Sequence, residues 1–387
     1  MTPQPIADRR ELMDALTTAC ELEHGLSLQY LYAAFTLRSD PTDGLQGSDL
    51  IRVRSWAASI FFVAAQEMMH LAQASNLLLS IGGAPHLARP DFPQPAGHYP
   101  PDLGWDLTGF DAATIDRFVA YESALPSGPG PAWRESIGQM YTTIADAFEQ
   151  LDLPDDELFI GDPGDQITGE MVDFPLLIEV TDRSSAVEAC RLIMVEGEGS
   201  PADHADCHEG IFRRIRSEIG EVDEPARPVA PNPVLTERGG EPHGTLVTDP
   251  VTRAVQEICN DAYEVLVLAL LGFFAGGSRD PAAPAVKAAT LQLMTTVIRP
   301  LGELLTRLPI GPEHVGLHAG PGFEIGDAAS LPPHRDTARR LMAERLDHAA
   351  ASARRLADDT TLPPSRTSVL DGVAANLQRC STLLWSP

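Results

Sequence analysis

The sequence is poor in positive charge. Its 387 residues hold 28 Lys and Arg residues, only one of them a lysine, against 55 Asp and Glu residues, and the formal net charge is −27. A chain this acidic repels the phosphate groups of nucleic acids and of anionic membrane surfaces. We therefore expect no nucleic-acid partner and no membrane partner.

Paired cysteines and long apolar runs are also missing. The chain has no C-x-x-C motif, and its five cysteines are scattered (Cys20, Cys190, Cys207, Cys259 and Cys380). This spacing is typical of reduced thiols and predicts neither a disulfide framework nor a structural zinc site. No run of 18 apolar residues predicts a spanning helix, and the first ten residues lack the apolar segment of a secretory signal. We expect a cytoplasmic protein.

Alternating strand patterns are nearly absent, and helical periodicity fills most of the chain. The pattern predicts helices, with a short strand only at 176–180. The expected architecture is all-α: a four-helix bundle in 1–220, a Pro-rich linker over 221–250, and further helices in 251–387 packed on the bundle. The predicted helices cover 9–36, 51–81, 111–122, 131–151, 183–197 and 203–218, then 250–275, 283–308, 334–358 and 365–384.

Carboxylates and a histidine lie on helix faces that should be apolar. Glu23 sits within an apolar stripe of the first helix. Glu67 and His70 form an E-x-x-H pair on one face of the second helix, flanked by Val63 and Leu71. A buried charge without a partner is costly, so these side chains need a shared partner. A metal ion is one, because E-x-x-H is the inward-facing ligand pair of carboxylate-bridged di-iron and di-manganese bundles.

Such a bundle takes further ligands from two other helices. Glu196 and Glu198 close the fourth long helix, and His204 and His208 lie in the next short one. Carboxylates at a helix C-terminus oppose the helix dipole, and a cation would offset this. The alternative interpretation, that these are solvated surface residues, stays open at this point.

Five stretches that carry these residues resemble the ferritin-like domain of the iminophenyl-pyruvate dimer synthases, a family of bisindole pathways such as violacein and rebeccamycin-type biosynthesis. They are ELEHGLSLQYLYAAF (21–35), AAQEMMHLAQASNLLLSIGGAP (64–85), SIGQMYTTI (136–144), AVEACRLIMVEGEG (186–199) and CHEGIFRRI (207–215). Residues 293–326 are similar to the region after this domain in the same family. The resemblance implies a ferritin-like four-helix bundle, non-haem iron, and oxidative chemistry on small, often amino-acid-derived substrates.

The resemblance also implies which residues act. One or two iron ions would be bound by Glu23, Glu67, His70, Glu198 and His208, with Glu196 and His204 as further candidates. Tyr30, Gln139 and Tyr141 would orient a bound oxygen species or line the pocket. Relatives commonly carry Glu at the position of Gln139, and often at that of Ala205. These two departures predict a centre that is altered or reduced to one tight ion.

The leading hypothesis is a non-haem iron oxidoreductase of specialised metabolism. It would use dioxygen or peroxide on a small aromatic imine, amine or keto acid that reaches the centre near the loops 84–110 or 311–326. Two alternatives stay open: a non-catalytic protein that stores iron, and a metal-free helical scaffold for a partner enzyme. A homodimer is the expected assembly, because two-fold dimers are the commonest oligomers.

Overall fold

The structure is a computed structural model that describes residues 5–94, 104–123, 136–172, 174, 176–197, 205–236, 244–325, 332, 334–359 and 362–385. These residues are mainly helical, and their only ladder is a short parallel pair between β1 (Pro233–Val234) and β2 (Thr245–Leu246). The predicted all-α class is confirmed.

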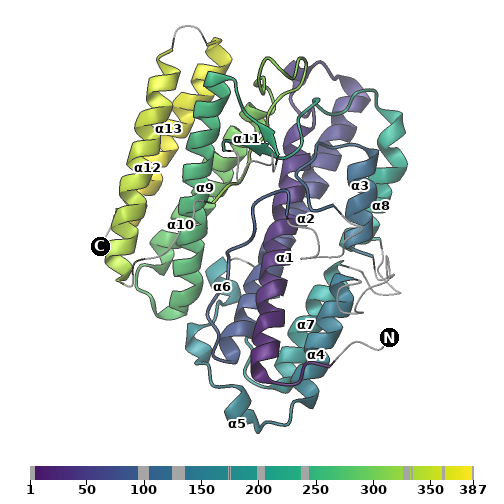
Figure 1. Ribbon diagram of the computed structural model, residues 1–387, viewed down its shortest axis with the longest axis vertical. Helices are drawn as coiled ribbons and strands as arrows, with labels where there is room; N and C mark the ends of the chain where they lie inside the picture. Colours follow the sequence, from purple (N-terminus) through teal and green to yellow (C-terminus); the bar gives the residue numbers. More distant parts are fainter. Residues whose placement is uncertain are drawn as a thin grey trace.

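Four long helices form the N-terminal bundle (Figure 1): α1 (Arg9–Thr36), α2 (Gly47–Ser80), α4 (Ile137–Gln150) and α7 (Arg183–Gly197). The α1 helix packs against α2, α4 packs against α7, and α1–α4 and α2–α7 contacts close the bundle. Asp8 and Ser136 accept hydrogen bonds from backbone N–H groups in the first turns of α1 and α4 and so fix where these helices begin.

Shorter helices flank the bundle. The α3 helix (Ala112–Tyr121) packs on α8 (His208–Glu218), and this pair covers one side of α1 and α2. The α5 (Asp155–Leu158) and α6 (Gly169–Val172) helices are single turns in the connection that leads to α7.

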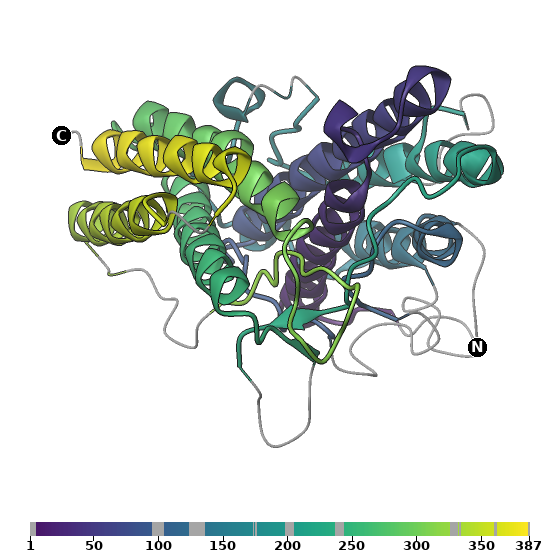
Figure 2. The ribbon, with the colours of Figure 1, turned by 90° about the horizontal axis from the view of Figure 1, so that it is seen from above.

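The C-terminal helices lie together on the other side of α1, as Figures 1 and 2 show from two directions. They are α9 (Pro250–Gly276), α10 (Ala283–Gln292), a π-helical turn (Leu293–Ile298), α11 (Arg299–Leu305), α12 (Arg335–Ala357) and α13 (Pro364–Trp385). By length and composition α9 could cross a membrane. The sequence predicts no spanning helix here, because polar residues interrupt the apolar run. Inside the fold, 67% of its most apolar stretch is buried, as in the core helix of a helical protein.

The π-helical turn results from Pro300, which lacks the N–H that would bond the carbonyl of Thr296 in an α-helix. Asn376 on α13 supplies a donor instead, and its Nδ2 lies 3.2 Å from that carbonyl oxygen. The polar backbone group that proline leaves unpaired therefore attaches α13 to the rest of the C-terminal helices.

The short strand predicted at 176–180 is wrong, and two buried amide side chains explain why. The backbone N–H and carbonyl of Ile178 bond the amide of Gln73, at 2.7 and 3.0 Å. Those of Val180 bond the amide of Gln166, at 2.8 and 2.7 Å. The apolar run is therefore extended but pairs with side chains, which satisfy the groups that a neighbouring strand would satisfy.

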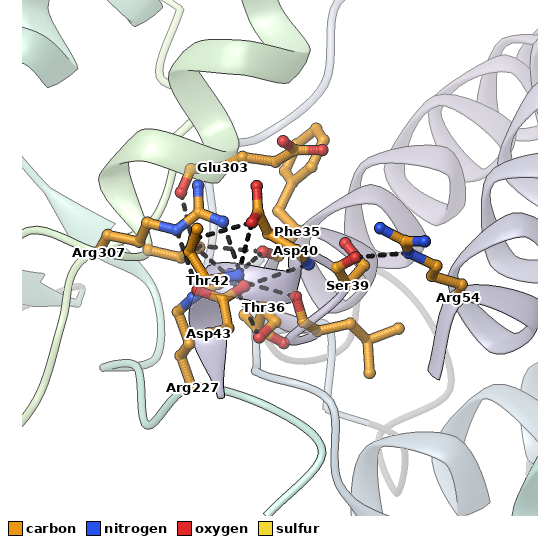
Figure 3. A network of polar contacts seen from close by, with 12 residues as sticks. Phe35, Thr36, Ser39, Asp40, Thr42, Asp43, Arg54, Arg227, Glu303 and Arg307 are labelled. Carbon is orange, nitrogen blue, oxygen red and sulfur yellow. Dashed lines mark hydrogen bonds and ion pairs between the residues drawn. The ribbon is translucent and has the colours of Figure 1, made fainter. Parts of the chain in front are cut away.

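In the segment predicted as a linker, 221–250, the residues next to Arg227 lie against the C-terminal end of α1, where the backbone N–H of Arg227 donates to the carbonyl of Thr36 at 2.8 Å (Figure 3). Arg227 is buried there, and its Nη1 donates to the carbonyl oxygen of Phe35 at 3.1 Å. Its Nη2 pairs with the carboxylate of Asp43, to which Arg307 also donates at 3.2 Å. Burial and the neighbouring Arg307 lower the pKa of Arg227. Arg227 thus caps the C-terminal end of α1. Through the shared carboxylate of Asp43 it also connects this helix end to Arg307, which lies among the C-terminal helices.

A buried chain of hydrogen bonds joins α1 to α9. The Nδ1 of His24 lies 2.9 Å from the carbonyl oxygen of Leu87, and its Nε2 lies 2.7 Å from the hydroxyl of Tyr263. Arg89 donates to that hydroxyl at 3.1 Å and to the carbonyl of Phe323 at 2.6 Å. Because a carbonyl only accepts, the hydrogen of His24 is on Nδ1 and Tyr263 donates to Nε2. Burial lowers the pKa of His24 to about 3, which keeps the imidazole neutral.

Tyr263→Phe is expected to destabilise the protein by about 1–3 kcal/mol, because it leaves an imidazole nitrogen and a guanidinium N–H buried without their partner. The measurement is the urea midpoint at neutral pH. Tyr32→Phe is the matched control, since this buried hydroxyl donates only to the carbonyl of Ala230 at 2.6 Å. A loss for Tyr263→Phe no larger than that of the control would contradict the prediction.

Candidate metal centre

Four glutamates and two histidines from five helices converge in the bundle. All six side chains are nearly inaccessible, and the most exposed, that of Glu196, is 14% exposed. They are Glu23 on α1, Glu67 and His70 on α2, Glu122 at the end of α3, Glu196 in the last turn of α7, and His208 at the start of α8.

The pairing of α3 with α8 positions the two ligand candidates outside the long helices. The α3 helix ends at Glu122, whose backbone N–H donates to the carbonyl of Phe118 at 3.2 Å. The α8 helix begins at His208, because the thiol sulfur of Cys207 accepts a backbone N–H of the first turn. The rings of Phe118 and Phe212 pack with centroids 5.3 Å apart and hold the two helices together.

Glu67 lies between the two histidines. Its Oε2 is 3.1 Å from Nδ1 of His70, and its Oε1 is 2.9 Å from Nδ1 of His208. An oxygen of Glu23 lies 3.7 Å from the same nitrogen of His70, and one of Glu122 lies 3.5 Å from that of His208. The centre therefore consists of two half-sites that share Glu67: the His70 half-site with Glu23, and the His208 half-site with Glu122.

Each half-site has a tyrosine behind its own carboxylate. The hydroxyl of Tyr141 donates to Glu23 at 2.6 Å, and the hydroxyl of Tyr30 donates to Glu122. Burial raises the pKa of both tyrosines well above its ordinary value, so both stay neutral donors. The two tyrosines thus fix the orientation of the carboxylates, one in each half-site.

Charge in the centre is unbalanced without a cation. Burial raises the pKa of Glu23 to about 7. Burial alone would lower the pKa of His208, but the carboxylates of Glu67 and Glu122 raise it to about 9. The imidazoles therefore carry the positive charge that faces the four carboxylates. Metal ions would replace these protons, so metal binding must release them.

The donor set fits a metal ion. Glu67, His70 and His208 each offer one ligand atom within 4.8 Å of the other two. Oε1 of Glu67 and Nδ1 of His208 are buried and form an ion pair at 2.9 Å, but this contact does not have the geometry of a hydrogen bond. Buried polar atoms are nearly always satisfied, so this pair favours a metal ion that both atoms would bind. Imidazole and carboxylate donors suit iron, manganese and zinc.

A small pocket, with a cavity volume of about 20 Å³ and partly open to solvent, adjoins the half-sites. Its polar side is formed by the centre itself, and its other side is apolar, with Leu26, Ile137, Ile193 and Met194. No described residue of the loops 84–110 and 311–326 lines it, although substrate access was expected there. These loops meet instead around Arg89, where its guanidinium bonds the carbonyl of Phe323.

The structure brings Glu23, Glu67, His70 and His208 together and adds Glu196 beside His70. Of the predicted active residues, Tyr30 and Tyr141 contact the centre directly. The side chain of Gln139 is half-buried and is not among the described residues that line the pocket. Glu198 and His204 lie outside the described residues.

Glu122 is the residue that the sequence analysis missed. Relatives commonly carry a glutamate at the position of Gln139 on α4, whereas the additional carboxylate of this chain comes from the end of the short helix α3. A signal was present, because Glu122 closes its helix at the negative end of the dipole. Glu196 and Glu198 became candidates through this same signal.

Comparison with known proteins decides the family. The family model named ferritin-like matches residues 16–217, just over half of the chain. The chain belongs to the ferritin-like family. The membership that its motifs predict is thereby confirmed. A solved ferritin-like protein from Caulobacter vibrioides has a TM-score of 0.50 and 20% identity, covering 75% of this chain and 96% of its own, and shows the fold alone.

Two curated relatives of this ferritin-like chain are biosynthetic enzymes. It is 28% identical to the dichlorochromopyrrolate synthase of Lentzea aerocolonigenes, over 90% of this chain and 39% of the synthase. It is 29% identical to the 2-imino-3-(indol-3-yl)propanoate dimerase of Chromobacterium violaceum, over 82% of this chain and 34% of the dimerase. The chain thus spans well under half the length of either relative.

Proposed function

We propose that this ferritin-like chain is a non-haem di-iron oxidoreductase of specialised metabolism. It would oxidise or oxidatively couple a small amino-acid-derived substrate, such as an aromatic imine, amine or keto acid, with dioxygen or peroxide as co-substrate. The observation that carries the proposal is Glu67, placed between Nδ1 of His70 and Nδ1 of His208 with a further carboxylate in each half-site. The names of the two relatives, a synthase and an imine dimerase, support the substrate class.

Each half-site would bind one metal ion. Glu23 and His70 would hold one ion, Glu122 and His208 the other, and Glu67 would contact both. Bound iron would supply one-electron redox chemistry and the activation of dioxygen or peroxide.

The protein's own residues prepare the site for such a reaction. Tyr30 and Tyr141 hold the two outer carboxylates by hydrogen bonds. The apolar side chains of the pocket would contact the hydrocarbon or aromatic part of a substrate, which must widen this small pocket to reach the centre. Position 197 favours glycine, because a Cβ at this position would lie only 3.1 Å from a carboxylate oxygen of Glu122 and would crowd the centre. A cytoplasmic location and a homodimer are further parts of this proposal.

The test is the metal content of protein expressed in iron-rich medium, combined with dioxygen uptake. Two irons per chain are expected, together with dioxygen uptake that depends on an added aromatic 2-imino acid, generated in the assay by an amino-acid oxidase and followed after that oxidase is removed. Bound iron without substrate-dependent uptake for any member of a panel of imines, amines and keto acids would favour storage. A folded wild-type protein that binds no metal would overturn the proposal and favour a scaffold.

A further inference from the structure

The two half-sites are alike on the side that faces Glu67 and differ on the opposite side. In both, Nδ1 of a histidine faces Glu67 and a carboxylate that a tyrosine holds. The remaining nitrogen, Nε2, points away from Glu67 in each case. In the His70 half-site it lies 2.9 Å from a carboxylate oxygen of Glu196. In the His208 half-site it lies 3.2 Å from the amide oxygen of Gln66.

Both outer partners have the geometry that selects the ligand nitrogen. An acceptor at Nε2 holds one hydrogen there, so that the proton a metal ion would replace is the one on Nδ1, the nitrogen that faces Glu67. Glu196 and Glu67 lie at different nitrogens of the His70 ring, so Glu196 does not share the position that faces Glu67. Glu196 and Gln66 therefore act through the histidines, as positioning residues.

The charge of the outer partner is what distinguishes the half-sites. A carboxylate accepts a charge-assisted hydrogen bond and makes the imidazole a more basic ligand, whereas an amide is a neutral acceptor. Glu196 also lies in the last turn of α7, where the helix dipole adds negative potential near His70. At the His208 half-site, the start of α8 and the end of α3 have opposite dipole ends, which offset each other.

We propose that Glu196 and Gln66 make the two half-sites unequal, so that the His70 half-site binds its metal ion first and more tightly than the His208 half-site. This inference rests on the proposed metal centre. It assigns to Glu196 the role of orienting His70, in place of the role of a metal ligand that the sequence left open for it.

The experiment is an anaerobic titration of the metal-free protein with Co²⁺, followed by its absorption bands. Wild-type protein is expected to bind two ions in two resolved steps. Glu196→Gln should weaken the first step by about 10–100-fold, the usual effect of removing an outer partner of a metal-bound histidine, and retain two ions per chain. Gln66→Glu should strengthen the second step in the same way.

Single half-site backgrounds provide the controls. In His208→Ala, which retains the His70 half-site, the added change Glu196→Gln should weaken the remaining ion about 10–100-fold. In His70→Ala, which retains the other half-site, the same change should leave affinity unaltered. Far-UV circular dichroism confirms that each variant is folded.

Four results would overturn the inference. Two equal steps in wild-type protein would show that the half-sites do not differ. Loss of one ion in Glu196→Gln would show that this residue is a ligand rather than a positioning residue. Equal weakening in the two single half-site backgrounds would show a merely structural effect. Absence of any Co²⁺ binding in folded wild-type protein would overturn the metal centre itself, and the inference with it.

Discussion

Glu67→Gln is expected to abolish the binding of both metal ions and to destabilise the metal-free protein by about 3–5 kcal/mol, the usual loss when one partner of a buried ion pair is removed. Glu67 is the one carboxylate shared by both half-sites, so its loss affects both ions. In the metal-free centre Glu67 lies between the imidazoles of His70 and His208. Burial alone would raise the pKa of Glu67, but these imidazoles lower it. Glutamine leaves both imidazoles without this charge partner.

The measurement pairs elemental analysis after desalting with a thermal unfolding scan of the chelator-treated protein. Glu21→Gln is the matched control, because Glu21 is also a partly buried carboxylate on a helix, paired with His86 at 3.0 Å outside the centre. The control should keep both ions. Retention of one ion by Glu67→Gln would show that Glu67 serves a single half-site, and an unchanged melting temperature would show that its ion pairs do not stabilise the metal-free protein.

Arg227→Met is expected to cost about 3–5 kcal/mol of unfolding free energy, the usual loss when one partner of a buried ion pair is removed. Its Nη1 donates to the carbonyl oxygens of Phe35, Thr36 and Leu37, at 3.1, 3.4 and 3.1 Å. Methionine fills similar space and bonds none of them, so the end of α1 loses its cap. Figure 3 shows how the guanidinium lies between these carbonyls and Asp43.

The variant Arg307→Met distinguishes the contribution of the helix cap to stability from that of the ion pair with Asp43. Arg307 binds the same Asp43 at 3.2 Å, but its side chain is 31% exposed and it bonds no carbonyl of α1 in the described contacts. Its loss should cost about 1 kcal/mol or less, as for other partly exposed pairs. Urea unfolding at neutral pH measures both variants. Equal losses would mean that the ion pair, and not the capping of α1, accounts for the effect.

The sequence was most informative where the chemistry is local. Glu67 and His70 share one helix face because they are three residues apart, and this follows from helical geometry alone. The class of fold and the positions of the long helices follow from periodicity in the same way. The search for further ligands after the fourth long helix made His208 a candidate, and the family resemblance supported it, although no spacing rule connects it to α2.

Features that depend on long-range contacts could not be predicted in this way. Glu122 reaches the centre only because α3 packs on α8, and no periodic pattern encodes that pairing. Arg227 looks like an ordinary charged residue in a Pro-rich stretch until the chain returns to the end of α1. The run at 176–180 has the composition of a strand, and only the amide of Gln73 shows what its backbone bonds instead.

The hydrogen-bonded chain at His24 also sets an order of events during protein synthesis. His24 and its partner Tyr263 are 239 residues apart, and Arg89 and Phe323 are 234 apart. At about 5–20 residues per second, a ribosome needs about 10–50 s to make the chain between His24 and Tyr263. During that interval Nε2 of His24 lacks its partner beside the apolar face of the nascent α1, a state in which chaperones would shield the helix. The helix that carries Glu23 thus completes its packing only after α9 has emerged from the ribosome.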